Sequence, residues 1–216
     1  MPSRGAVWDC ACGSGQASLD LAARFERVLA TDASAGQIES ATPHPRVEYR
    51  VAPAEKSGLL DASVDCVTIA QALHWFDIDA FFVEVRRVVK RGGAVVAWTY
   101  GVPRLEDPKA DALVQNFYSV TVGPYWPPER AIVEAGYDSL AFPFEEIGPP
   151  AFAMTAEWPL AQLLGYFASW SATARYVAAL GKNPVREFAE ELAPAWGDPD
   201  RALTVSWPLT CRAGRV

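Results

Sequence analysis

Short runs of apolar and β-branched residues alternate with helical patterns along the first hundred residues. Such runs predict β-strands, and they cover Ala6–Cys10, Arg27–Thr31, Arg46–Val51, Ser63–Ala70 and Ala94–Tyr100. Between them, helices are expected over Gln16–Phe25, Ser34–Ala41 and Asp77–Lys90, the last ended by Arg91-Gly92-Gly93. This alternation predicts an α/β, doubly wound, mostly parallel sheet whose strand carboxyl ends share one edge. Ligands of such sheets bind at that edge.

The pattern changes after Trp98, because residues 98–216 hold 18 of the 25 aromatic residues and the strand–helix alternation fades. Helices are expected over Pro108–Thr121, over Pro127–Ala135, and over Leu160–Leu192 with breaks at 169–171 and 181–184. Strands are expected near Phe144–Ile147, Ala202–Trp207 and Leu209–Arg212, and Pro208 predicts a bulge or a sheet edge. The whole sheet is expected to have seven strands.

The length fits a single domain over residues 1–216. We expect residues 1–101 to form a cofactor-binding half and residues 102–216 an acceptor-side half. The acceptor-side half is expected to contain a helical insert at about 151–200, which would form an aromatic-rich lid.

The chain has 26 acidic and 19 basic residues and a net charge of −7. Such a chain has no general attraction to nucleic-acid phosphates or to anionic membranes, so neither is an expected partner. It shows no run of 18 apolar residues and no secretory signal pattern, so a cytoplasmic location is expected. Its four cysteines and two histidines lack paired metal-ligand spacing, so reduced thiols and no metal are expected. The sequence indicates no particular oligomeric state.

A glycine-containing turn, Asp9-Cys10-Ala11-Cys12-Gly13-Ser14-Gly15-Gln16, separates the first strand from the first helix. Glycines let a backbone approach a ligand closely and leave helix N–H groups open to it. Asp32 closes the second strand, 19 residues after Gly13. A carboxylate at that position can accept hydrogen bonds from both hydroxyls of an adenosine ribose.

Two ligand classes share this layout. The dinucleotide fingerprint needs a third glycine or alanine, but Ser18 stands at that position. S-adenosylmethionine carries a ribose, an adenine and an amino-acid end without a pyrophosphate. Asp9 would repel a pyrophosphate, whereas it can orient the turn or meet an ammonium group, directly or through water.

Three segments together resemble one family. The stretch Asp9–Gln16 resembles motif I of class I S-adenosylmethionine-dependent methyltransferases. The stretches Gln71-Ala72-Leu73-His74-Trp75-Phe76-Asp77 and Leu164–Ala172 are similar to segments of its small-molecule type 11 group, related to trans-aconitate methyltransferase. The resemblance covers nearly the whole chain and implies a Rossmann-like fold and methyl transfer to a small organic acceptor, with a carboxylic acid favoured.

The resemblance also implies roles for individual residues. Asp9, Gly13 and Gly15 would shape the pocket for the methionine end of the cofactor, and Asp32 would hold the ribose. The remaining implied cofactor contacts are Ala33 and Gln37 near the adenine, Ala54 and Glu55 at the adenine edge, and Gln71 and Ala72 near the methionyl group. Ala11 stands where the motif usually has its first glycine; its methyl is tolerable at negative φ and can crowd the cofactor.

A carboxylate acceptor needs a cationic anchor and no general base, whereas a phenol, amine or hydroxyl needs a base. His74 is the candidate base, with a structural role in fixing its loop as the alternative. Trp75 could cap the cofactor or face its sulfonium through a cation–π contact, and it also counts as a substrate-side candidate. For the acceptor lid, Tyr125, Trp126, Trp170 and Tyr176 are candidates for the inner face and Arg130 and Arg175 for a carboxylate anchor. The alternative for each is a packing or surface role.

Two other functions stay open at this point. Relatives carry a helical segment ahead of motif I, and this chain starts about five residues before its first strand. Together with Ala11, this motivates a non-catalytic or truncated protein of the same fold with weak cofactor binding. A nicotinamide-dependent oxidoreductase is disfavoured by Ser18 and by the lack of a Tyr-x-x-x-Lys pair. A DNA-base methyltransferase is disfavoured by Gln71-Ala72-Leu73-His74, where an Asn/Asp-Pro-Pro-aromatic motif is expected.

Overall fold

The computed structural model describes residues 3–216 and divides into two compact units. The first unit contains the chain up to Thr99, then Ile132–Ala151 and Thr210–Val216. The second contains Tyr100–Ala131 and Phe152–Leu209. The chain therefore leaves the first unit close to the expected division at residue 101, but two later segments return to it. That both units together make one domain stays a prediction.

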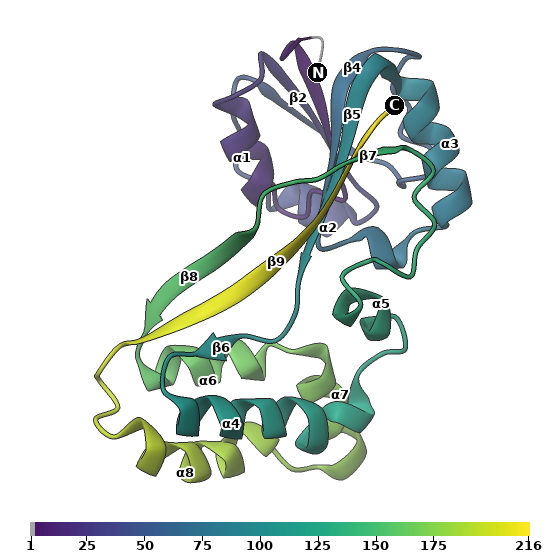
Figure 1. Cartoon of the computed structure of the whole chain (residues 1–216). Coiled ribbons are helices and arrows are strands. Elements are labelled where there is room, and N and C mark those ends of the chain that lie inside the picture. The colour runs from purple at the N-terminus through teal and green to yellow at the C-terminus, as the bar shows by residue number, and fades with distance from the viewer. Residues whose placement is uncertain (1–2) are drawn as a thin grey trace. The chain divides into compact units, whose positions relative to one another are not determined.

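The first unit is built on a parallel sheet with the order β3-β2-β1-β4-β5 (Figure 1). Its strands are β1 (Ala6–Cys10), β2 (Arg27–Asp32), β3 (Val47–Val51), β4 (Val64–Ala70) and β5 (Val89–Tyr100). The short strand β7 (Glu145–Ile147) pairs antiparallel with the end of β9 (Leu203–Arg215). The predicted Rossmann-like α/β architecture is confirmed, and the order reverses between β1 and β4, where ligands of such sheets bind.

Helices cover both faces of this sheet because the side chains of each strand alternate between them. Trp8 of β1 packs with Phe81 and Val85 of α3 (Ile78–Val88). Its neighbour Val7 packs with Ala22 of α1 (Gln16–Ala22) on the other face. The remaining helices that reach this unit are α2 (Ala35–Glu39), which Ser34 caps as expected, and α5 (Arg130–Glu134).

The junction of α3 and β5 differs from the prediction. The helix ends at Val88 and the strand begins at once, so Arg91-Gly92-Gly93 lies inside β5. The register with β4 shifts there, from Val64 opposite Val89 to Cys66 opposite Ala94. Gly92 has φ +79°, and a Cβ on Gly93 would lie 2.7 Å from the Asp65 carbonyl oxygen. The glycines therefore form an irregularity inside the strand: Gly92 supplies the positive φ, and Gly93 leaves no room for a side chain.

The second unit packs four helices against an antiparallel ribbon. The helices are α4 (Pro108–Asn116), which continues as a π-helical turn to Thr121, α6 (Leu160–Ala168), α7 (Ser171–Leu180) and α8 (Pro184–Trp196). The predicted breaks after α6 and α7 are confirmed. The ribbon joins β6 (Arg104–Leu105), the first half of β9 and β8 (Phe152–Trp158). Aromatic rings fill the core, and the Phe117 and Phe188 rings stack at 4.3 Å.

The described residues form nine strands, two more than predicted, because β6 and β8 were not expected. β6 has only two residues, and β8 contains alanine, methionine and glutamate, which favour strands weakly. The helical insert expected from about residue 151 therefore opens with a strand. Pro208 does not interrupt β9. It is exposed and pairs with Ala153 of β8 on one side. On the other side it lies beyond the pairing with β6, which reaches only to Ser206. A missing N–H is tolerated where a neighbouring strand does not require it.

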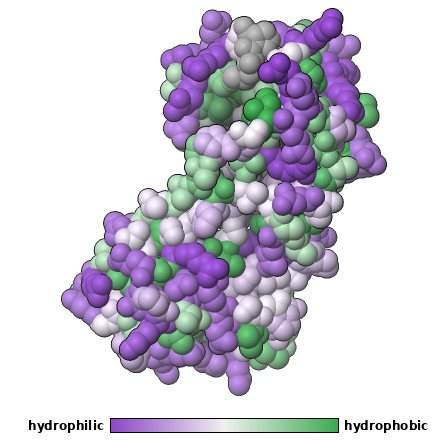
Figure 2. All heavy atoms as spheres, viewed as in Figure 1, coloured by the Kyte–Doolittle hydropathy of each residue, from purple (hydrophilic) through white to green (hydrophobic). Residues whose placement is uncertain are grey.

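Hydrophilic side chains cover most of the face in Figure 2, with hydrophobic ones scattered among them. Within residues 3–216, no helix combines the length and the apolar character needed to cross a membrane.

Candidate functional site

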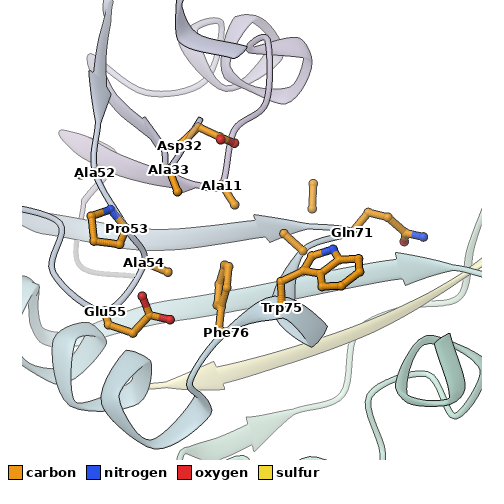
Figure 3. Close-up of a pocket in the computed structure, with 12 residues that line it drawn as sticks. Ala11, Asp32, Ala33, Ala52, Pro53, Ala54, Glu55, Gln71, Trp75 and Phe76 are labelled. Atoms are coloured by element: carbon orange, nitrogen blue, oxygen red, sulfur yellow. The ribbon is translucent and has the colours of Figure 1, made fainter. Parts of the chain in front are cut away.

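A cavity of about 360 Å³ lies at the carboxyl ends of the parallel strands of the first unit (Figure 3). Its volume falls in the range of small-molecule pockets. Segments that follow β1, β2, β3 and β4 line it with Ala11, Asp32, Ala33, Ala52, Pro53, Ala54, Glu55, Ala70, Gln71, Ala72, Trp75 and Phe76. Seven of the eleven predicted cofactor contacts are in this group, and Trp75 joins them.

The Asp32 carboxylate is fixed by two backbone amides. Its Oδ2 accepts the Gly13 N–H at 2.9 Å, and its Oδ1 accepts the Ser34 N–H at 2.8 Å. Each carboxylate oxygen has a second lone pair, so Asp32 keeps acceptor capacity toward the cavity. The sequence placed Gly13 and Asp32 in one cleft, and the hydrogen bond between them joins the turn after β1 to the end of β2.

Three amides of the glycine turn have hydrogen-bond partners inside the protein. The Gly13 N–H goes to Asp32, the Gly15 N–H to the Cys12 carbonyl and the Cys12 N–H to the Thr31 carbonyl. Neither Gly13 nor Gly15 is among the cavity-lining residues. These three N–H groups are therefore taken up within the protein, and the expectation of open N–H groups at the start of α1 stays a prediction.

Gly15 is required by close packing. It has φ +86°, and an added Cβ would overlap the Tyr49 hydroxyl and lie 2.8 Å from the ring carbon Cε1. Tyr49 comes from β3, so its ring holds the start of α1 against the sheet. The Gln37 amide lies on the other side of the turn, where a Cβ on Gly13 would be 3.8 Å from its Oε1.

Asp9 lies behind the turn and is 1% exposed. Its Oδ2 accepts the Ser18 hydroxyl at 2.6 Å and its Oδ1 accepts the Thr68 hydroxyl at 3.1 Å. Burial raises the pKa of Asp9 to about 6, although both hydrogen bonds act to lower the pKa. Asp9 does not line the cavity, and its two hydrogen bonds fit the expected role of orienting the turn, while a contact with a ligand ammonium stays a prediction.

Two cavity residues without the freedom of glycine have left-handed backbones, Ala11 with φ +54° and Gln71 with φ +55°. Such conformations are strained and cluster at functional sites. Ala11 therefore does not have the negative φ that would make its methyl easily tolerated. The Gln71 N–H donates to the Trp98 carbonyl, and its Oε1 accepts the Thr99 hydroxyl at 2.6 Å. In Figure 3 the Gln71 side chain extends away from the other labelled groups, leaving its backbone at the cavity.

The segment after β3 forms another wall of the cavity. It contributes Ala52, Pro53, Ala54 and Glu55, and Figure 3 shows the Glu55 carboxylate directed toward the Phe76 side. Glu55 Oε1 accepts the Asp77 N–H at 3.0 Å. The side chains of Ala52, Pro53 and Ala54 are small and apolar, and Glu55 is the charged residue of this wall.

His74 lies outside the cavity lining. Its Nδ1 is 3.4 Å from the hydroxyl of Tyr137, and the two rings stack at 6.2 Å. Tyr137 is completely buried in the core of the first unit. These contacts fit the alternative role of His74 in fixing its loop, and the role as a base stays a prediction.

Six of the seven acceptor-side candidates belong to the second unit, and the seventh, Trp75, lines the cavity of the first. Tyr125 and Tyr176 pack edge to face at 4.9 Å, and Trp126 and Trp170 pack at 5.4 Å. Arg130 lies 4.7 Å over the Trp126 ring. Arg175 is exposed on α7. The structure thus brings five of the six into two aromatic groups and leaves Arg175 on the surface.

Arg130 is held by aromatic contacts. Its Nε donates to the Tyr118 hydroxyl at 2.7 Å, and its guanidinium also lies over the Tyr118 ring. The hydrogen bond and the two ring contacts together fix the plane of the Arg130 guanidinium. Tyr118 is 7% exposed and was not singled out from the sequence.

The two cysteines of the turn are poor nucleophiles. Burial raises the pKa of Cys12 to about 12 and that of Cys10 well above its ordinary value. Both remain protonated near neutral pH, and a thiolate is the form that attacks or binds metal. Among residues 3–216, no group of three or more His, Cys, Asp or Glu side chains is arranged to hold a metal ion.

Sequence reasoning missed three residues that shape the site: Ser18, Thr68 and Tyr49. Ser18 counted only against the dinucleotide fingerprint, yet its hydroxyl is a hydrogen-bond partner of Asp9. Thr68 lies in the buried strand β4, and a buried hydroxyl requires a hydrogen-bond partner, which here is Asp9. Nothing in the local sequence marks Tyr49 as the residue that contacts Gly15.

Comparison with known proteins decides the family. Residues 8–97 match the type 11 family described as a methyltransferase domain. A methyltransferase-family protein of Dictyostelium discoideum is 33% identical over 206 residues, covering 93% of this chain and 78% of that protein. The chain belongs to the class I S-adenosylmethionine-dependent methyltransferases.

Two further relatives add detail to this methyltransferase. A type II methyltransferase-family protein from Anaeromyxobacter dehalogenans is 50% identical to this chain in sequence. Its solved structure matches this one with a TM-score of 0.94, and the match covers 99% of this chain and 91% of the other. A malonyl-[acyl-carrier protein] O-methyltransferase of Methylovorus sp. is 29% identical, and the match covers 62% of this chain and 50% of that protein.

Proposed function

We propose that the methyltransferase holds the adenosine part of S-adenosylmethionine in the cavity of its first unit and methylates a small organic acid. The observation that carries the proposal is Asp32, whose carboxylate is fixed by Gly13 and Ser34 at the edge of the cavity. The residues fit the cofactor in three respects: the cavity has ligand size, Asp32 has free acceptor capacity for ribose hydroxyls, and the opposite wall is small and apolar.

Each part of the cavity has its own role in this proposal. Asp32 would accept hydrogen bonds from the ribose, and the segment from Ala52 to Glu55 would border the adenine. Trp75 is 62% exposed at the rim, so its ring is available to exclude water. The chemistry that the cofactor supplies when bound is an electrophilic methyl group on a sulfonium. The protein then contributes alignment and desolvation.

A carboxylate acceptor agrees with the groups that the structure offers. An ionised carboxylate has no proton to lose, so its methylation needs no base, and His74 lies outside the cavity lining. Arg130 offers a guanidinium that Tyr118 and Trp126 orient. Such a fork suits a carboxylate. The Methylovorus relative is named for O-methylation of a malonyl group, and this name favours an acid as acceptor. The finer resemblance to trans-aconitate methyltransferase stays a prediction.

The test is a product assay with methyl-labelled S-adenosylmethionine. Mono-, di- and tricarboxylic acids would be compared with their amides and with phenols. We expect label only with acids, released as methanol by mild base because the product is a methyl ester. Arg130→Gln should raise KM for the acid, and Arg175→Gln serves as a matched control because Arg175 is exposed. Label on phenols or amines alone would contradict the proposed acceptor class.

A further inference from the structure

The wall after β3 is held by a helix that does not itself line the cavity. The segment between Val51 and Val64 supplies Ala52, Pro53, Ala54 and Glu55 to the cavity. Its first residue is tied to the sheet, because the Ala52 N–H donates to the Asp32 carbonyl at 3.0 Å. Beyond that residue, the segment needs another anchor to keep its shape.

Helix α3 provides this anchor at two places. At its start, the Asp77 N–H donates to Glu55 Oε1 at 3.0 Å. Two turns further along, Glu84 Oε1 accepts the Ser57 N–H at 2.8 Å and also the Ser57 hydroxyl. The same hydroxyl accepts the Leu59 N–H at 3.1 Å. One carboxylate thus fixes both the backbone and the side chain of a residue two positions beyond Glu55.

Glu84 is buried, with 6% of its surface exposed, and it is charged. Burial alone would raise its pKa, but hydrogen bonds from Arg87 and Ser57 outweigh it, so the pKa of Glu84 lies below its ordinary value. Arg87 donates through Nε at 2.8 Å and through Nη2 at 2.7 Å. A buried charge is costly unless it is fully paired. The Glu84 carboxylate is paired with Arg87, and it also accepts two hydrogen bonds from Ser57, which belongs to the segment that borders the cavity.

We propose that Glu84 is a positioning residue for the adenosine end of the cofactor, acting through Ser57 on the wall at Ala54 and Glu55. The inference rests on the proposed placement of adenosine in this cavity. It predicts that weakening the Glu84–Ser57 contact loosens the wall and reduces affinity for adenosine, apart from any loss of stability.

The chain offers a matched control in Asp65. It is also a buried carboxylate, and it accepts a backbone N–H from Ala6 at 2.9 Å, a serine hydroxyl from Ser3 at 2.7 Å and a cation from Lys90 at 3.0 Å. Its partners lie at the amino ends of the strands, and none of them lines the cavity. Asp65→Asn should therefore lose comparable stability without touching the adenosine wall.

The experiment measures calorimetric affinities of the full chain for adenosine and for S-adenosylhomocysteine, with urea unfolding in parallel. For Glu84→Gln we expect affinity to fall by about five- to twentyfold for both ligands, the scale of a weakened charged hydrogen bond. For Asp65→Asn we expect less than about a twofold change at a similar loss of stability. Equal weakening in both variants, or no weakening in Glu84→Gln, would overturn the inference.

A second variant covers the case in which Glu84→Gln does not fold. Ser57→Ala keeps the Glu84–Arg87 pair and the Ser57 N–H, and it should weaken adenosine binding by about two- to fivefold. Where Glu84→Gln does fold, Ser57→Ala in that background should weaken adenosine binding little further, because both substitutions act through one contact. Full additivity, or unchanged affinity in Ser57→Ala, would contradict the positioning role. If the unmodified chain bound neither ligand, the proposed function itself would fail.

Discussion

The Asp32 carboxylate accepts the Gly13 N–H at 2.9 Å, which fastens the turn after β1 to the end of β2. A second bond, from the Ser34 N–H at 2.8 Å, aligns the start of α2 with the same carboxylate. Parallel strands bring such residues to one edge, although 19 positions separate them in sequence. The contact therefore sets the shape of the cavity before any ligand is present.

Gly15 should tolerate alanine much less well than Gly58. Both have positive φ, +86° and +71°, so both pay about 1 kcal/mol or more for a Cβ. At Gly58 the added Cβ meets nothing within 4 Å, whereas at Gly15 it overlaps Tyr49. We expect Gly15→Ala to lose about 1–3 kcal/mol more stability than Gly58→Ala in urea unfolding.

Tyr49→Ala tests the cause of that difference. In the Gly15→Ala background it should recover part of the lost stability, because it removes the overlapping ring. Equal stabilities of Gly15→Ala and Gly58→Ala would show that the packing against Tyr49 is not as described.

Ala11→Gly should leave stability unchanged or raise it by up to about 1 kcal/mol. Relief of the left-handed backbone at φ +54° gains about 1–2 kcal/mol, and the extra freedom of the unfolded chain costs about 0.4–1 kcal/mol. Ala33 lines the same cavity but is not among the residues with positive φ, so Ala33→Gly should only destabilise. Thermal unfolding of the two variants checks this, and a larger loss for Ala11→Gly would refute the assignment of strain.

The stability of the chain should depend on the ionisation of Asp9. Its folded pKa of about 6 lies above the ordinary value of 3.8, so the folded state holds its proton more tightly. Ionisation of buried Asp9 costs the folded state free energy. This cost is absent below about pH 4, grows between about pH 4 and pH 6, and levels off above pH 6 at up to about 3 kcal/mol.

Asp9→Asn removes this penalty. Its unfolding free energy relative to the unmodified chain should therefore rise between pH 4 and pH 7, measured in urea at matched ionic strength. A difference that stays constant over this range would mean that the Asp9 pKa is not raised. Asp61→Asn is a suitable control because its side chain is 80% exposed.

The five parallel strands and most of the cavity lining could be predicted from the sequence because local pattern decides both. Short apolar and β-branched runs mark the strands, and the end of each strand places its following residues at the shared edge. Asp32 follows from that rule, whereas Glu55 was expected from the family resemblance. The second-unit helices were also predictable: the break between α7 and α8 falls at Gly181 and Pro184, and the break between α6 and α7 falls at Ser169–Ser171.

The remainder depends on contacts between distant segments. Asp9 looked like a ligand contact, but Thr68, 59 residues away, takes up one of its oxygens. His74 looked like a base, but Tyr137, 63 residues away, faces its Nδ1. β8 mixes strand-favouring Phe152, Thr155 and Trp158 with alanines and a glutamate, and all seven of its residues pair with β9. No local pattern reports such pairings.

The central claim is that Asp32 holds the ribose of S-adenosylmethionine, and calorimetry of Asp32→Ala tests it most directly. Loss of hydrogen bonds to a charged group should weaken binding by about 1.5–3 kcal/mol, which is about ten- to 150-fold in Kd. Asp32→Asn, which keeps one acceptor, should fall between this variant and the unmodified chain. Unchanged affinity of a folded Asp32→Ala variant, or tighter binding of NAD than of S-adenosylmethionine by the unmodified chain, would contradict the account.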